Sequence, residues 1–227
     1  MKRSQINDIM AEADDMIRHH GFTLPPFANW SPVEFKARTD AQRIIDARLG
    51  WDITDYGQRN YAAQGLFLFT LRNGSLADLQ GGRGMVYAEK LLISKQDQLS
   101  PCHTHVIKTE DIINRGGATL AVELYGSDDE GNFAEDRGGT VICDGIARDF
   151  APGEVLTFAP GESLTLSPGD WHAFWGDKGD VLIGEVSPVN DDLTDNIFRE
   201  PFGRFADIDE DVDPTHLLVS DYDRWLN

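Results

Sequence analysis

The first fifty residues show a helical pattern of apolar positions. One stripe recurs at spacings of three and four residues, made up of Ile6, Ile9, Met10, Ala13 and Ile17. This spacing predicts an amphipathic helix, with Ser4 as its N-cap and Gly21 at its end. His19 and His20 fall in the last turn and have no ligand-type partner at a suitable spacing, so we expect them on the surface.

A second helix is predicted to begin at Ser31. The order Ser31, Pro32 and Glu34 is a capping-box signature with proline at the first helical position. We expect this helix to continue in broken form as far as Gly50.

From about residue 51 the pattern changes to short β-prone runs separated by glycine, proline and aspartate. The predicted strands are Leu66–Leu71, Val86–Ser94, Ser100–Val106, Asp111–Asn114, Leu120–Tyr125, Thr140–Cys143, Ala147–Phe150, Leu156–Phe158, Leu164–Leu166, His172–Trp175, Val181–Val186 and Leu217–Val219. Many short strands at such spacing indicate a mainly β protein, an antiparallel sandwich or barrel, with the N-terminal helices packed outside.

Composition adds limits to this picture. A chain of 227 residues fits one domain. We divide it into an N-terminal helical extension (1–50), a barrel (51–190) and a C-terminal cover (191–227). The formal charge of −19 argues against nucleic acid and anionic membrane surfaces as partners. The chain has no apolar run of membrane-spanning length, no secretory pattern at the N-terminus and only two cysteines, so we expect a cytoplasmic protein.

Candidate chemistry gathers on the predicted strand from residue 100. His103 and His105 are two positions apart, so their side chains share one face of a strand. Glu110 follows after a short turn, and a later Pro-Gly turn leads into His172. These four residues predict a metal site inside the barrel, because buried imidazoles need partners that a metal supplies.

Three nitrogens and one carboxylate oxygen suit Mn²⁺, Fe²⁺, Co²⁺, Ni²⁺ or Zn²⁺. The sequence does not choose among these ions. Four protein ligands leave two positions of an octahedral ion for two oxygens of one substrate.

The same residues carry a resemblance to the cupin superfamily. His103-x-His105-x₄-Glu110-x₆-Gly117 resembles the first cupin motif, and Gly161-x₅-Ser167-Pro168-Gly169-x₂-His172 resembles the second. Asp97 and Ser167 depart from the usual glycine and proline, but both are turn positions. The resemblance implies a double-stranded β-helix (jelly-roll) barrel that holds the metal.

A narrower resemblance covers most of the chain. The segments Ala88–Ile93, His103–Gly117 and Gly184–Asn196, with Asp192 inside the last, are similar to the cupin-type D-lyxose isomerases. This family implies interconversion of D-lyxose and D-xylulose, and often of D-mannose and D-fructose. It also implies Mn²⁺ or a similar ion, and a homodimer.

Isomerisation of this kind needs a carboxylate that carries a proton between C1 and C2. Glu185 is the candidate, in an apolar strand where we expect it to face inward. Lys108 lies between the second histidine and Glu110 and is predicted to donate to a sugar oxygen. With one metal we favour a cis-enediol route over a hydride shift.

Further residues are candidates for contact with the substrate. Lys90 has the opposite strand parity to Glu89, so one of the two should face inside. Asp195 and Arg199, just past the last predicted strand, are candidates for holding the far hydroxyls of the sugar. The aromatic residues around the fourth metal ligand are Trp171, Phe174 and Trp175, of which one could stack on the sugar.

Three other functions fit parts of the pattern. A non-haem iron cupin dioxygenase uses similar ligands, a phosphosugar isomerase would need a phosphate cradle, and a sugar-binding or storage cupin needs no catalytic groups. We favour the sugar isomerase.

Overall fold

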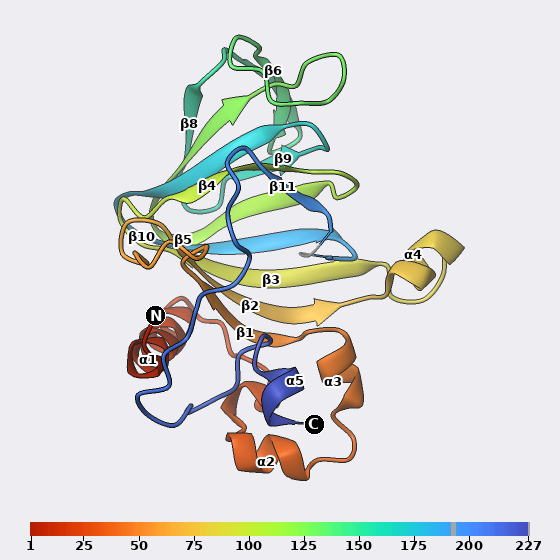
Figure 1. The fold of residues 1–227 in the computed structure, drawn as a ribbon. Coiled ribbons are helices and arrows are strands. Elements are labelled where there is room, and N and C mark those ends of the chain that lie inside the picture. Colours follow the sequence, from red (N-terminus) through yellow and green to blue (C-terminus); the bar gives the residue numbers. More distant parts are fainter. Residues whose placement is uncertain (192–193, 227) are drawn as a thin grey trace.

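The computed structural model describes residues 1–191 and 194–226, and Asp192 of the isomerase-like segment lies outside the described residues. Helices gather at one end of the molecule, below the sheet in Figure 1, except for one short helix that projects to the side. They are α1 (Arg3–His19), the 3₁₀ helix η1 (Pro26–Asn29), α2 (Pro32–Ala37), α3 (Gln42–Asp46), the projecting α4 (Leu76–Gly81) and α5 (Tyr222–Trp225).

The described residues also form a series of β-strands. They are β1 (Gly50–Thr54), β2 (Leu66–Asn73), β3 (Tyr87–Ser94), β4 (Ser100–His105), β5 (Glu110–Tyr125), β6 (Gly139–Cys143), β7 (Ile146–Phe150), β8 (Glu154–Phe158), β9 (Ser163–Leu166), β10 (Trp171–Pro188) and β11 (Asn196–Phe198).

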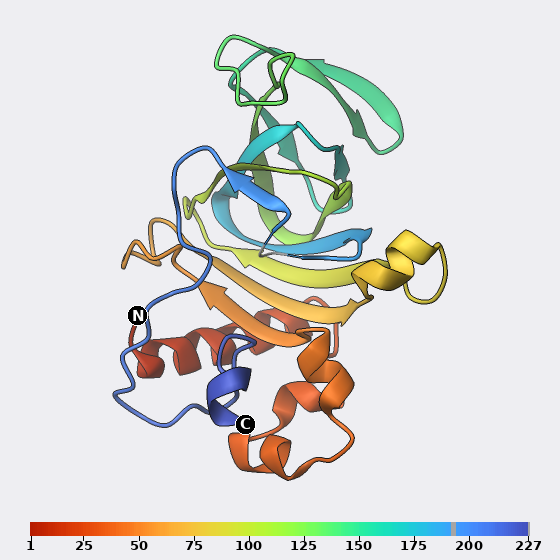
Figure 2. The same cartoon turned by 45° about the vertical axis from the view of Figure 1, so that its right-hand side comes forward.

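These strands pair antiparallel and curl into a barrel (Figures 1 and 2). The order is β1-β2-β3-β10-β5-β9-β6-β7, with β8 on β5 and β4 between β10 and β11. The long strand β10 connects the two parts of the sheet that contain β3 and β4. Its C-terminal half pairs with β3, and its N-terminal half pairs with β4. The expected mainly β barrel with helices outside is therefore confirmed.

Two apolar cores lie on opposite sides of the same strands. In β2, Leu66 and Leu68 face the barrel core, whereas Phe67 and Phe69 face a second core under α1. The stripe predicted for α1, from Ile6 to Ile17, fills this second core. Because both faces of β2 are covered here, the sequence of its first half, Leu66–Phe69, is apolar with no alternation.

The start of α1 differs from the prediction. Its N-cap is Lys2, which has no side-chain capping bond, and Ser4 lies inside the helix, where its backbone N–H and its hydroxyl donate to Asp211. A carboxylate from the distant C-terminal segment thus takes over the capping contact. The capping box at Ser31 and Glu34 is confirmed.

The strand predictions are confirmed with three changes. Asp111–Asn114 and Leu120–Tyr125 belong to one strand, β5, and the two predicted strands after residue 171 form the single strand β10. Leu217–Val219 contributes only a bridge between Leu218 and Trp51. Strands β1 and β11 were not predicted.

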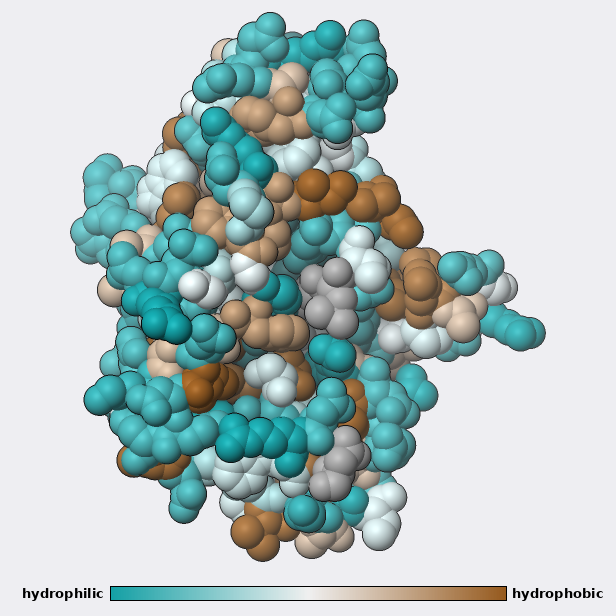
Figure 3. Space-filling model, in the orientation of Figure 1, coloured by the Kyte–Doolittle hydropathy of each residue, from teal (hydrophilic) through white to brown (hydrophobic). Residues whose placement is uncertain are grey.

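No helix of the described residues is long and apolar enough to cross a membrane. The face in Figure 3 is largely hydrophilic, in line with the charge of −19. The division of the chain at residues 50 and 190 stays a prediction.

Arg3 ties the first turn of α1 to the C-terminal segment. Its guanidinium is fully buried and donates two hydrogen bonds to Asp221 at 2.8 and 2.9 Å and two to Glu210. We expect Arg3→Ala to lower the free energy of unfolding by about 3 kcal/mol or more, because the mutation leaves the buried Asp221 carboxylate without its cation. Urea unfolding measures this change.

The matched control is Arg18→Ala on the same helix. Arg18 is largely exposed and pairs with Asp14 one turn away, so its loss should cost no more than about 0.5 kcal/mol. Equal shifts of the two unfolding midpoints would contradict the importance of the Arg3 contact.

Candidate active site

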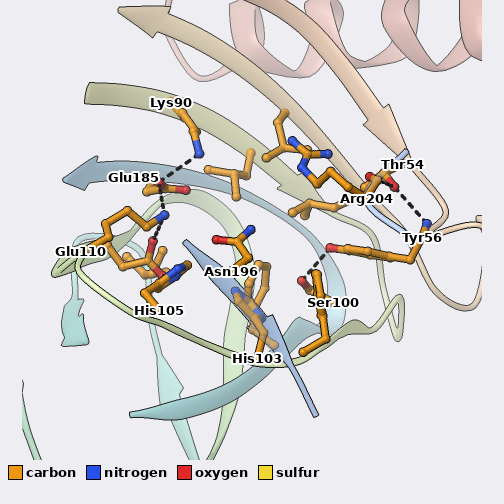
Figure 4. A pocket seen from close by; sticks show the side chains of 17 residues that line it. Thr54, Tyr56, Lys90, Ser100, His103, His105, Glu110, Glu185, Asn196 and Arg204 are labelled. Carbon is orange, nitrogen blue, oxygen red and sulfur yellow. Dashed lines mark hydrogen bonds and ion pairs between the residues drawn. The ribbon is translucent and has the colours of Figure 1, made fainter. Parts of the chain in front are cut away.

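A hollow inside the barrel brings together most of the predicted functional residues (Figure 4). It encloses about 480 Å³ between its lining atoms, including the part continuous with solvent. The lining includes Lys90, His103, His105, Lys108, Glu110 and Glu185.

Strand pairing places the four predicted metal ligands together. His172 of β10 lies opposite His103 of β4, and the register shifts before the next pair, Phe174 and Ser100. Glu110 is the first residue of β5, directly after the turn that follows His105. One ligand atom from each of these four buried residues lies within 4.8 Å of the others, so the group could hold a metal ion.

Backbone carbonyls orient two of the imidazoles. Nδ1 of His103 lies 2.9 Å from the carbonyl oxygen of Pro101, and Nδ1 of His172 lies 3.1 Å from that of Asp170. A carbonyl can only accept, so Nδ1 carries the proton in both rings. The lone pair is then on Nε2, the atom free to bind a metal.

The charges in the cluster suit a divalent cation. Burial and the neighbouring imidazoles of His172 and His105 hold the pKa of His103 well below its usual value, so this ring is neutral. Burial would raise the pKa of Glu110, but Lys108 and His105 outweigh it and hold the pKa well below its usual value. Neutral imidazoles and a carboxylate are the forms that ligate metals.

A buried nitrogen atom supports the same interpretation. Nε2 of His172 has no hydrogen-bond partner among the described residues. Nε2 of His172 lies 3.4 Å from Oε1 of Glu110, but without the geometry of a hydrogen bond. A metal ion between these atoms would satisfy the His172 nitrogen, and the residues present therefore fit the expected group.

Glu185 lies beside this cluster, between two lysines. Its Oε1 lies 3.0 Å from Nζ of Lys108 and 3.3 Å from Nζ of Lys90, and all three side chains are buried. Lys108 also contacts Oε2 of Glu110 at 2.6 Å. Of the pair Glu89 and Lys90, the lysine faces inward, and Glu185 faces inward as predicted.

Lys90 is held by a contact that we did not predict. Its Nζ donates to Oδ1 of Asn190 at 2.6 Å, and Asn190 in turn exchanges two hydrogen bonds with the side chain of Asn73 through its own backbone. Asn190 belongs to the isomerase-like segment, but its sequence position gave no sign of this role.

Two predicted substrate contacts lie elsewhere. The carboxylate of Asp195 accepts hydrogen bonds from the backbone N–H groups of residues 106 to 108, the turn between His105 and Glu110. Asp195 does not line the hollow, and its contacts hold the turn that connects two of the candidate ligands. Arg199 is exposed and its guanidinium stacks on Phe133. Of the three aromatic candidates, Phe174 lines the hollow and Trp171 and Trp175 do not.

The wall facing Glu185 carries polar residues that we did not predict. They are Tyr56, which follows β1, Ser100, Asn196 of β11 and Arg204. Strands β1 and β11 had no predicted counterpart, so no signal placed Tyr56 in the site. For Asn196 a signal existed, because this residue ends the isomerase-like segment.

Comparison with known proteins agrees with the geometry. The family model described as D-lyxose isomerase matches residues 1–222. A D-lyxose/D-mannose isomerase of Serratia proteamaculans is 44% identical over 230 residues, which is 100% of both chains. A D-lyxose/D-mannose isomerase of Escherichia coli O157:H7 is 44% identical over 226 residues, which is 98% of both chains.

Solved structures share the fold at low identity. An L-ribose isomerase of Acinetobacter sp. DL28 in complex with L-ribose superposes with a TM-score of 0.60 at 14% identity, covering 91% of this chain and 98% of the other. An L-ribose isomerase of Cellulomonas parahominis with L-ribose gives 0.60 at 16% identity, covering 92% and 98%. The full-length family match and the two relatives decide the assignment: this chain belongs to the D-lyxose isomerase family and is an isomerase.

Proposed function

We propose that this enzyme is a metal-dependent aldose–ketose isomerase that interconverts D-lyxose with D-xylulose, and D-mannose with D-fructose, through a cis-enediol. The observation that carries the proposal is the position of Glu185 in the hollow that His103, His105 and Glu110 line, three of the four residues that could hold a metal ion. The family and the printed names of the two relatives support the choice of sugars.

In this proposal His103, His105, Glu110 and His172 hold the metal, which is Mn²⁺ in the cell. When bound, such an ion supplies Lewis-acid stabilisation of the negative charge that develops on the sugar oxygens. Following the family resemblance and the sequence, we also propose a homodimer and a cytoplasmic location.

Glu185 is the proposed catalytic base. Its carboxylate takes the proton from C2 of the aldose and returns it to C1 on the same face, while the hydroxyl proton on O2 passes to O1, which gives the ketose. Lys108, with its Nζ between the two carboxylates, is proposed to donate to a sugar oxygen and to keep Glu185 pointed at the cluster. Lys90 is proposed to bind a substrate hydroxyl from the other side of Glu185. The substrate-binding role predicted for Asp195 stays a prediction.

Membership of the isomerase family favours this function over the dioxygenase and the storage protein. One contact argues against a phosphosugar as the substrate. Arg204, the arginine that lines the described part of the hollow, already donates to the carboxylate of Asp52 at 2.6 Å, so its charge is balanced without a phosphate.

Removal of the second histidine tests the metal site. His105→Ala should reduce bound metal from about one ion per chain to a small fraction, because an open cage of three ligands binds far more weakly. Metal analysis after dialysis against Mn²⁺ measures this, with His19→Ala on the surface of α1 as the control. Unchanged metal content in His105→Ala would rule out the proposed ligand set.

Glu185→Gln tests the base. The variant should keep its metal and lose about 10²–10⁴-fold in kcat for D-lyxose, since the amide cannot accept the proton. The matched control is Glu89→Gln, a partly exposed carboxylate on the neighbouring strand that pairs with Arg72. Full turnover by Glu185→Gln, measured as ketose formed, would exclude Glu185 as the base.

A further inference from the structure

The hollow has a second polar side that the proposed chemistry does not use. In Figure 4, Lys90, Glu185, Glu110 and His105 lie on one side of the hollow, Tyr56 and Ser100 lie on the other, and Asn196 lies between the two sides. The hydroxyls of Tyr56 and Ser100 are 3.0 Å apart and buried. If C1 and C2 of an aldose lie at the metal side, the remaining hydroxylated carbons must extend toward this second side.

Asn196 is held in place by the strand that carries the metal ligands. In the pairing of β11 with β4, Asn196 lies opposite His105 and Phe198 lies opposite His103. Both side chains line the hollow, whereas Ile197 between them points outward and is 45% exposed. The backbone ladder therefore fixes Asn196 relative to the metal site, and its side chain is not needed for that pairing.

The amide of Asn196 has an unused hydrogen-bond acceptor. Its Oδ1 is buried and has no partner among the described residues. Figure 4 shows this amide in the middle of the hollow, between His105 and Glu185 on one side and the Tyr56–Ser100 pair on the other. A buried acceptor without a partner is costly, so its presence at this point calls for a ligand that donates.

We infer that Asn196 is a specificity-determining residue that binds a hydroxyl of the sugar beyond C2. Oδ1 accepts the hydrogen of that hydroxyl, and the NH₂ group of the same amide is suited to donate to the neighbouring hydroxyl oxygen of a vicinal diol. This inference rests on the proposed function, because it takes the reacting carbons of an aldose to lie at the metal side. A site that hydrogen-bonds a hydroxyl rejects analogues that lack it.

The test combines removal of the amide with removal of single substrate hydroxyls. Three variants are compared with the wild type: Asn196→Leu, which is similar in size but apolar; Asn196→Asp, which keeps an acceptor; and Ile197→Thr, the outward-facing control. Each enzyme is loaded with Mn²⁺ and assayed for kcat/KM with D-lyxose and with its 3-deoxy, 4-deoxy and 5-deoxy analogues.

For one analogue the wild type should lose at least about 10-fold in kcat/KM relative to D-lyxose. The Asn196→Leu variant should show a similar loss of kcat/KM with D-lyxose itself, relative to the wild type with D-lyxose. With the sensitive analogue, however, its kcat/KM should lie within about 2-fold of the wild-type value. Removing the amide and removing the hydroxyl delete the same hydrogen bond, so the two losses do not add. Asn196→Asp should keep most of the discrimination. Ile197→Thr should match the wild type throughout.

A second readout does not depend on turnover. Calorimetric titration with D-arabinitol, the reduced form of D-lyxose, should show weaker binding to Asn196→Leu than to the wild type, at equal metal content. The inference is overturned if, for all three deoxy analogues, kcat/KM relative to D-lyxose falls by the same factor in Asn196→Leu as in the wild type. It is also overturned if the only defect of Asn196→Leu is a lower metal content.

Failure of the proposed function gives a different result. In that case the wild type itself would form no ketose from D-lyxose, and the inference would fall with the function. If the wild type converts D-lyxose but the effects of Asn196→Leu and of hydroxyl removal simply add, the inference is overturned and the proposed function stands.

Discussion

The register between β4 and β10 is the constraint on which the rest of the site depends. It sets His172 opposite His103 and brings three imidazoles and the carboxylate of Glu110 into one buried group. Such a group is unfavourable in a protein interior unless cations complete it. Lys108 supplies a positive charge beside Glu110, and a divalent metal among the ligand atoms would bind the imidazole nitrogens.

The surroundings of the cluster serve this arrangement. Two carbonyl groups fix the tautomers of His103 and His172, and Asp195 holds the turn between His105 and Glu110 through backbone N–H groups. Strand β10 also connects the cluster to Glu185. Glu185 follows His172 by thirteen residues on this strand and lies beside the same cluster. One bent strand thus supplies both a proposed ligand and the proposed base.

The sequence predicted what depends on local periodicity. The two-residue period of a strand put His103 and His105 on one face, and the helical period gave the buried stripe of α1.

Local patterns carry less information on long-range pairing. Gly116, Gly117 and Gly179 break the apolar pattern, yet β5 and β10 continue through them with shifts of register, and each was predicted as two strands. The short strand β11 has its place only because β4 offers a free edge, so the position of Asn196 in the hollow could not be predicted. Likewise, the contact of Asp195 with the turn between His105 and Glu110 depends on tertiary structure.

The most direct test follows the hydrogen that is transferred from C2 to C1 of the sugar during isomerisation. Chelated protein is reloaded with Mn²⁺ and incubated with D-lyxose in D₂O, and the products are followed by NMR. We expect D-xylulose with deuterium at C1, because a proton held by Glu185 would exchange with solvent before it returns to the sugar. Ketose without deuterium would contradict transfer through an exchangeable proton, and no ketose from D-lyxose or D-mannose with any of the five candidate ions would contradict the isomerase itself.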